Sequence, residues 1–144
     1  MIKYEISVRI EGVTQSAVIE VHRTQAELRL IVGNTKSKIY KSHDCFHCFG
    51  LLRADFPHIM FLCKGARIDV YPSRMSSQMS CGMVAYQMEL GRRADREDMV
   101  RIFDYEDTDI TNDIREQEDF FKRWIRSLAG GSTEKYNKIM AIIS

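Results

Sequence analysis

Three successive segments near the start of the chain alternate polar and apolar residues. They are KYEISVRIEG (residues 3–12), VTQSAVIEVHR (13–23) and AELRLIVG (26–33). Alternation with a period of two places every second side chain on the same face of a β-strand. Because only Glu11 and Gly12 separate the first two segments, a tight hairpin is predicted between them. This part of the chain therefore predicts antiparallel strands with one buried face.

The pattern changes period after these strands. In HDCFHCFGLLRAD (43–55), cysteine and apolar residues recur at spacings of three and four, as they do along one face of a helix. Ser42 is a candidate N-terminal cap, and Pro57 prevents the helix from continuing. The sequence thus predicts a helix directly after the first strands.

Further strands are expected in the middle of the chain. SKIYKS (37–42) and MVAYQMEL (83–90) each predict one strand. IMFLCKGARIDVYP (59–72) predicts two strands joined by a hairpin turn at Lys64 and Gly65. The Ser- and Met-rich residues that follow predict a packed connector or an adaptable contact surface, because methionine side chains are flexible.

The last third of the chain predicts helices. The segments are 95–103, 110–128 and 132–143. Thr108 or Asp109 is a candidate cap for the long middle helix. We therefore predict an α+β fold, with a mainly antiparallel sheet and helices packed on it, mostly in the C-terminal half. The length of 144 residues predicts a single domain over residues 1–144.

Composition restricts the class of protein. The chain is 44% hydrophobic and 28% charged, which is typical of a globular protein, and its net charge of +1 gives no general nucleic-acid signature. It has no run of eighteen apolar residues that would predict a membrane span. The N-terminal residues alternate and carry charge, unlike a signal peptide, so we expect a cytoplasmic protein without membrane contact.

The cysteines leave more than one interpretation open. In the cytoplasm, Cys45, Cys48, Cys63 and Cys81 are expected to be reduced thiols, whereas two disulfides would be arithmetically possible in an exported protein. HDCFHC (43–48) is the best candidate for a zinc or thiol site. A structural zinc site uses two spaced ligand pairs, but the other two cysteines are isolated, so we favour buried structural thiols and expect no cofactor.

Motifs for nucleophilic or phosphate chemistry are weak. Cys81 has no recognisable nucleophile motif around it, and the nearby serines lack a Gly-x-Ser-x-Gly elbow. Lys64 and Gly65 do not form a Gly-rich phosphate loop before a helix. A small enzyme or nucleic-acid-processing protein that uses the segment 67–82 and nearby acids is the alternative function, without assigned catalytic residues.

Acidic residues dominate residues 104–119. They are Asp104, Glu106, Asp107, Asp109, Asp113, Glu116, Glu118 and Asp119. Arg115 is the single opposing cation in this segment. These carboxylates have two main interpretations: a solvated loop with acids that favour a helix N-terminus, or a docking surface for a basic protein. Carboxylates that converge on a catalytic centre or Mg²⁺ are a third.

The segment 62–106 carries a resemblance. It reads LCKGARIDVYPSRMSSQMSCGMVAYQMELGRRADREDMVRIFDYE and resembles a family of small bacterial proteins with a hydrophobic-Cys-x-Gly-Ala-Arg-x-Asp-Val-Tyr-Pro-Ser-x-Met-Ser core. An Ala-Tyr strand, a Leu-Gly turn and an acidic IFDY segment follow in both. That family is similar to the immunity proteins of contact-dependent growth inhibition and related polymorphic-toxin systems. The match covers roughly a third of the chain.

The resemblance implies a protein without catalytic residues that binds a cognate toxin domain and masks its active site. The expected toxin is a nuclease with a basic cleft, since nucleases attract phosphate backbones, and the inhibitor itself would not touch nucleic acid. We expect the first contacts at Asp104, Tyr105, Glu106, Asp107, Asp109 and Asp113, with Tyr105 as an aromatic anchor. Second-choice contacts are Arg67, Asp69, Tyr71, Arg74 and Met75.

Overall fold

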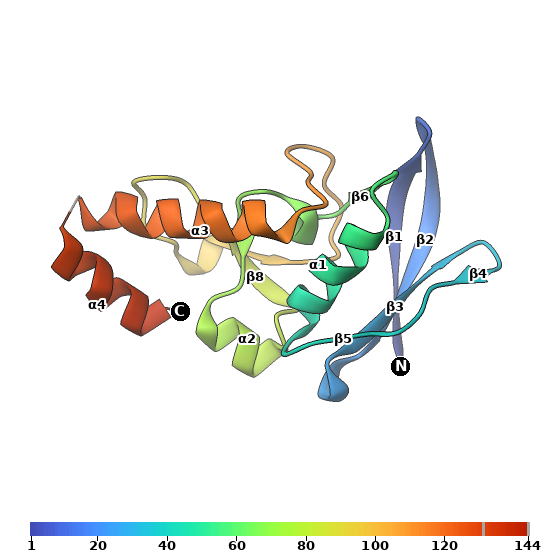
Figure 1. Cartoon of the computed structure of the whole chain (residues 1–144), viewed down its shortest axis with the longest axis horizontal. Coiled ribbons are helices and arrows are strands. Elements are labelled where there is room, and N and C mark those ends of the chain that lie inside the picture. Colours follow the sequence, from blue (N-terminus) through green and yellow to red (C-terminus); the bar gives the residue numbers. More distant parts are fainter. Residues whose placement is uncertain (131, 144) are drawn as a thin grey trace.

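The computed structural model describes residues 1–130 and 132–143. The strands are β1 (Ile2–Ile10), β2 (Val13–His22), β3 (Glu27–Val32), β4 (Thr35–Lys36), β5 (Tyr40–Lys41), β6 (Ile59–Leu62), β7 (Val70–Tyr71), β8 (Val84–Gln87) and β9 (Met99–Arg101). The α-helices are α1 (Cys45–Asp55), α2 (Arg74–Ser80), α3 (Ile114–Ala129) and α4 (Thr133–Ile143). Short 3-10 helices are η1 (Arg23–Gln25), η2 (Lys64–Ala66) and η3 (Arg96–Asp98). The antiparallel sheets and the late helices confirm the predicted α+β class (Figure 1).

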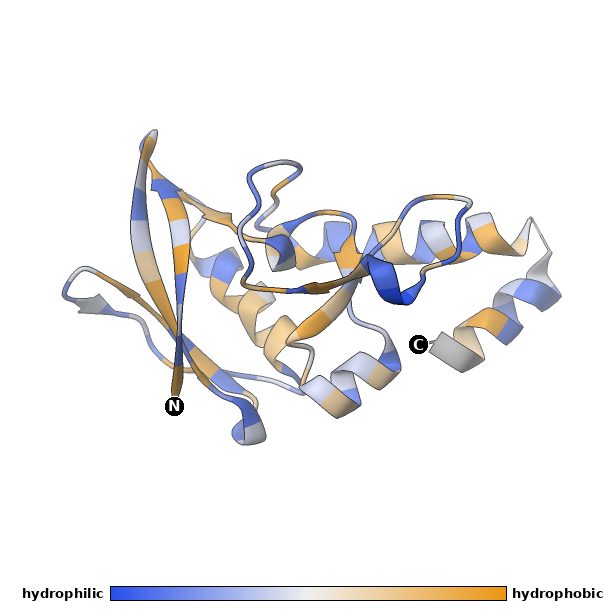
Figure 2. Ribbon diagram, turned by 180° about the vertical axis from the view of Figure 1, so that it is seen from behind, coloured by the Kyte–Doolittle hydropathy of each residue, from blue (hydrophilic) through white to orange (hydrophobic). Residues whose placement is uncertain are grey.

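The larger sheet has the order β4-β3-β2-β1-β6, and β5 also pairs with β3. The predicted hairpin is confirmed, because β1 and β2 pair antiparallel from Ile2 opposite Val21 to Ile10 opposite Val13. Glu11 and Gly12 both have positive φ angles (51° and 79°) in the turn. This backbone geometry matches the right-handed twist of the strands. Figure 2 shows hydrophobic and hydrophilic bands alternating along these strands, as expected for a sheet with one buried face.

Helix α1 covers the inner face of this sheet with Phe46, Phe49 and Leu52, all of them buried. The predicted cap at Ser42 is wrong. Asp44 caps the helix instead, because its Oδ1 accepts a hydrogen bond from the backbone N–H of His47 at 2.7 Å. The helix ends at Asp55, before the proline that was expected to stop it.

The predicted hairpin at Lys64 and Gly65 is also wrong. These residues lie in η2, β6 pairs with β1, and β7 pairs with β8 in a second sheet of order β7-β8-β9. Glycine occurs at position 65 because two backbone segments approach closely there, and not because the chain turns. A Cβ on Gly65 would lie 2.7 Å from the Cβ of Ile102, and the backbone N–H of Gly65 donates to the Ile102 carbonyl at 2.7 Å. Glycine is required there because a side chain would separate these two segments.

The Ser- and Met-rich segment forms a helix, which the sequence interpretation missed. Ser73 caps α2 by accepting a hydrogen bond from the N–H of Ser76 at 3.0 Å, and Cys81 ends it with a φ of 56°. Met75 and Met79 on this helix are 67% and 75% exposed. The segment is therefore ordered as a short helix that presents methionines at the surface.

The long helix α3 begins later than predicted. Neither Thr108 nor Asp109 caps it; Asp113 does, by accepting a hydrogen bond from the N–H of Arg115 at 2.9 Å. Asp109 has a φ of 57°, which is incompatible with a regular helix, so residues 104–113 form a loop. The helix expected at 95–103 is a single 3-10 turn, η3, followed by β9.

Helix α3 runs from beside α1 toward the end of the molecule farthest from the larger sheet, where α4 packs against it (Figure 1). Phe121, Trp124 and Ile125 of α3 pack with Met88 in a second hydrophobic cluster. The sequence offers Ser132 or Thr133 as the cap of α4, and it is the Oγ of Ser132 that accepts a hydrogen bond from the N–H of Lys135 at 3.2 Å. None of the helices in the described part of the chain is long and apolar enough to cross a membrane.

Candidate protein-binding site

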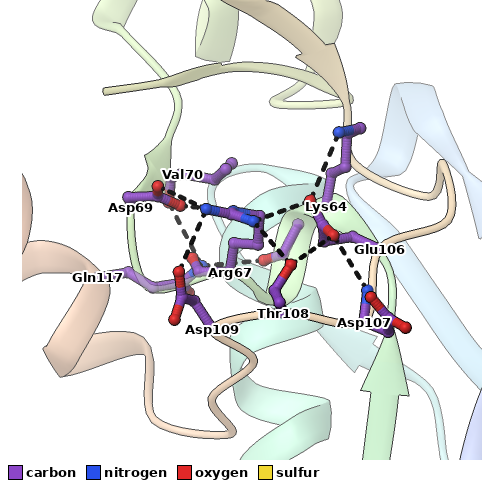
Figure 3. Close-up of polar contacts among 10 residues, drawn as sticks. Lys64, Arg67, Asp69, Val70, Glu106, Asp107, Thr108, Asp109 and Gln117 are labelled. Atoms are coloured by element: carbon purple, nitrogen blue, oxygen red, sulfur yellow. Dashed lines mark hydrogen bonds and ion pairs between the residues drawn. The ribbon is translucent and has the colours of Figure 1, made fainter. Parts of the chain in front are cut away.

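Arg67 binds carboxylates of the loop at residues 104–113, which we call the acidic loop (Figure 3). Its Nε and Nη2 bind the two carboxylate oxygens of Asp69 at 2.7 and 2.8 Å. Nη1 reaches Oε1 of Glu106 at 2.8 Å, and Nη2 reaches Oδ2 of Asp109 at 3.3 Å. The Arg67 side chain is only 11% exposed, and its hydrogen bonds to Asp69 raise the pKa of the guanidinium. One arginine thus joins carboxylates that are forty residues apart in the sequence.

Glu106 connects the arginine to the loop backbone. Its Oε2 accepts hydrogen bonds from Thr108 Oγ1 at 2.8 Å and from the N–H of Asp107 at 3.1 Å. Lys64 Nζ lies 3.7 Å from its Oε1. Partial burial raises the pKa of this carboxyl, but the hydrogen bonds from Thr108 and Arg67 outweigh it and lower the pKa to about 2. Glu106 is therefore ionised at neutral pH, and its carboxylate holds the loop in place instead of offering a free charge to a partner.

Backbone hydrogen bonds also fix the loop along the segment 62–68. Lys64 N–H donates to the carbonyl of Asp104 at 2.8 Å, and Ile68 N–H donates to that of Asp109 at 2.9 Å. Thr111 N–H donates back to Ala66 at 2.8 Å. The loop is therefore tied at its start, middle and end.

Two buried residues that the sequence interpretation missed support this region from below. Nε2 of Gln117 contacts the carbonyls of Gly65, Arg67 and Val70 at 2.9, 2.7 and 3.3 Å. Its Oε1 accepts a hydrogen bond from Nη2 of Arg53 at 2.6 Å. The sequence did contain an indication of this role. Gln117 lies on the apolar stripe of α3, where a polar side chain is buried and needs hydrogen-bond partners.

Arg53 links α1 to the end of the acidic loop. Its Nη1 donates to the carbonyl of Thr111 at 2.6 Å, and its Nε donates to that of Phe49 at 3.3 Å. The side chain is completely buried, and this burial lowers the pKa of Arg53 to about 10. The guanidinium remains charged at neutral pH, so its carbonyl and amide partners are essential.

The six first-choice residues divide into exposed and structural groups. Asp104, Tyr105 and Asp107 are exposed, and Tyr105 is 59% exposed although its backbone bridges to Cys63. The Tyr105 hydroxyl lies 3.4 Å from Oδ2 of Asp107. Within residues 1–130 and 132–143, the carboxylate of Asp104 has no hydrogen-bond or ion-pair partner. These three residues form a projecting acidic tip.

The remaining first-choice acids have internal partners. Glu106 and Asp109 bind Arg67, although the Asp109 side chain remains 68% exposed. Asp113 caps α3, and hydrogen bonds from Arg115 lower its pKa. The sequence therefore overstates the number of free negative charges in this loop.

The second-choice residues lie in two places. Arg67 and Asp69 belong to the cluster just described, whereas Tyr71, Arg74 and Met75 lie at the junction of β7 and α2. Arg74 and Met75 are exposed. The structure thus brings the first- and second-choice residues together only at Arg67 and Asp69.

Tyr71 is part of an aromatic groove between α2 and α3. Its ring stacks on Phe121 with a centroid distance of 4.8 Å. A cavity of about 250 Å³ is lined by these two rings together with Met75, Tyr86 and Trp124, among others. Burial raises the pKa of Tyr71 to about 12, so it stays neutral. This volume is below the roughly 300–1,000 Å³ of ordinary small-molecule pockets, so the groove better suits a single side chain.

The alternative sites remain chemically weak. Cys45 and Cys48 are fully buried, and the Cys48 thiol donates to the carbonyl of Ala26 at 3.0 Å. Ser77 Oγ donates to Oδ2 of Asp44 at 2.5 Å, and His43 Nε2 lies 4.0 Å from the same oxygen. No cluster of three or more possible metal ligands occurs among the described residues.

Comparisons with known proteins add no assignment to this geometry. No protein-family model matches the chain, and a search of curated proteins finds no significant match.

Proposed function

We propose that this protein is an immunity protein that binds a cognate bacterial toxin domain, of the nuclease class, and masks its active site. The observation that carries the proposal is the acidic tip, in which exposed Tyr105 lies between exposed Asp104 and Asp107. An aromatic side chain between carboxylates is suited to enter a basic cleft. The sequence resemblance points in the same direction.

The way in which the loop is held supports this proposal. Arg67 and Glu106 fix the loop side chains, and the backbone bonds to the segment 62–68 fix its path. A surface that is already ordered loses less conformational entropy when it binds. The acidic tip is therefore a preorganised contact rather than a flexible acidic tail.

Electrostatics give the proposed partner its chemistry. The side chains of Asp104 and Asp107 have no cation bound to them among the described residues. A nuclease domain that attracts phosphate is positively charged around its cleft, so the tip occupies the position of the nucleic acid. In this proposal the protein acts in the cytoplasm, carries no cofactor and does not touch nucleic acid.

The test uses the gene directly upstream, which is expected to encode a large secreted effector. Its C-terminal domain should stop growth when expressed alone, and co-expression of this protein should restore growth. The two should also co-purify at substantial salt concentration. If that domain is not toxic, or if its toxicity is unaffected by this protein, the proposal is wrong for this pair.

A second candidate function rests on the hydrogen bond between Ser77 and Asp44 beside His43. These residues line a hollow of about 290 Å³ together with Arg74. However, Oδ1 of Asp44 already caps α1, so the carboxylate has a structural role. This candidate predicts hydrolysis of simple esters or phosphoesters that is lost in Ser77→Ala without loss of folding.

A further inference from the structure

The thiols of Cys45 and Cys81 meet where α1 begins and α2 ends. Their sulfur atoms are 3.4 Å apart, and the backbone N–H of Cys45 donates to the carbonyl of Cys81 at 2.7 Å. A direct backbone hydrogen bond keeps the two residues within the spacing that disulfide partners require. The sulfurs need to approach by little more than 1 Å to reach the disulfide bond length of about 2.05 Å.

The backbone around the pair is firmly placed. A Cβ on Gly82, which has a φ of 73°, would lie 2.9 Å from the Cβ of Phe46. The end of α2 is therefore pressed against the start of α1, and the Ser77–Asp44 hydrogen bond joins the same two helices. The two thiols can therefore form a bond through small side-chain rotations, without movement of a helix.

Accessibility distinguishes the two cysteines. Cys81 is partly exposed, whereas Cys45, Cys48 and Cys63 are completely buried. Burial raises the pKa of Cys45, so its thiol stays protonated at neutral pH. An oxidant in solution therefore reaches Cys81 first, and Cys45 is positioned to react second.

We propose that Cys45 and Cys81 are a modification site at which hydrogen peroxide converts two thiols into an intramolecular disulfide. The Cys81 sulfur attacks the peroxide O–O bond, which gives a sulfenic acid and water. The Cys45 sulfur then attacks the Cys81 sulfur, the S–O bond breaks, and the leaving hydroxyl takes the Cys45 thiol proton and departs as water. The two thiols lose two electrons in total, and the peroxide gains them.

This bond would join α1 to α2 and close the chain between residues 45 and 81. The closure fixes the helix that carries Met75 and Met79, next to the aromatic groove. The reaction requires only the protein and a peroxide, so the inference goes beyond the proposed function and does not depend on it.

The test treats the full-length protein with graded hydrogen peroxide under native conditions, followed by blocking of free thiols and peptide mapping. We expect a peptide in which Cys45 is linked to Cys81, the loss of two free thiols per chain, and a melting temperature higher by about 5–10 °C. Thiol reductant should reverse all three changes.

Matched variants sharpen this result. Cys81→Ser and Cys45→Ser should lose the linkage and the thermal shift, whereas Cys48→Ser, one helical turn from Cys45, should keep both. If a variant fails to fold, the peptide map of the peroxide-treated wild-type protein alone tests the proposal. Peroxide that gives only a sulfinic acid at Cys81, an intermolecular dimer, or a different linked pair overturns the proposal.

Discussion

The acidic loop and helix α2 are both exposed, but different forces hold them. The loop at residues 104–113 depends on polar contacts with two buried side chains, those of Arg67 and Gln117. Helix α2 depends on a serine cap and a tight connection to α1, and it leaves Met75 and Met79 in solvent. The difference is that many charged side chains of the loop are bound inside the protein, whereas the methionines of α2 are left for solvent or a partner.

This comparison predicts that the loop is far more sensitive to the loss of one polar side chain. The largest effect is expected for Gln117→Leu, which keeps the volume but leaves three carbonyls and the Arg53 guanidinium without this partner. The free energy of unfolding should fall by about 3–5 kcal/mol. Urea denaturation measures it, with exposed Glu116→Gln as the control. A decrease in the free energy of unfolding of less than about 1 kcal/mol would contradict the proposed supporting role of Gln117.

A smaller loss is expected for Arg67→Met. The variant leaves Asp69 and Glu106 close together without their shared cation, and we expect unfolding to be easier by about 2 kcal/mol at pH 7 because the cluster is partly open to solvent. The matched control is Arg74→Met on α2, whose exposed guanidinium should contribute less than about 0.5 kcal/mol. Equal losses in the two arginine variants would contradict the difference between the regions.

The same cluster predicts a pH dependence. The folded pKa of Glu106 is about 2 and its ordinary value is 4.5, so the contribution of this carboxylate is complete above about pH 5 and is lost as the pH falls toward 2. Glu106→Gln should therefore be less stable than the wild type by about 1 kcal/mol at pH 7. That difference should shrink steadily between pH 5 and pH 2 in urea denaturation series. A difference that is independent of pH would mean that the ionised carboxylate is not the stabilising group.

The smallest effect on stability is expected at α2. Met75→Ser combined with Met79→Ser removes exposed side chains and should change the free energy of unfolding by less than about 0.5 kcal/mol. If α2 is a secondary contact, the same variant weakens toxin binding less than reversal of the acidic tip does. Calorimetric titration of both variants measures this order, and a larger loss at α2 would move the binding centre to the aromatic groove.

The regular parts of this fold could be predicted from local sequence. Alternation over residues 3–33 identified the first three strands, and helical spacing identified α1 and α3, because in each case one face is buried. The cap at Asp113 was missed because Thr108 and Asp109 are equally good caps in isolation. The positive φ of Asp109 and its contact with Arg67 show that the chain is still a loop there, and both depend on the folded structure.

The long-range contacts could not be predicted in the same way. Lys64 and Gly65 resemble a hairpin turn, but the partners of η2 come from Ile102 and Asp104, almost forty residues later. The acidic run was visible in the sequence, yet its division into paired and exposed carboxylates depends on Arg67. Pairing across such separations is decided by tertiary packing rather than by local pattern.

The most direct test of the acidic tip is a pair of charge-matched reversals, Asp104→Lys with Asp107→Lys, and Glu11→Lys with Glu97→Lys. The four residues are exposed, and the reversals avoid Asp109 and Asp113, which bind Arg67 and cap α3. The affinity for the C-terminal domain of the upstream effector is measured by calorimetric titration. The first variant should bind at least about a hundredfold more weakly than the wild type, and the second within a few fold of it. Equal affinity of the two variants would contradict the acidic tip as the binding surface.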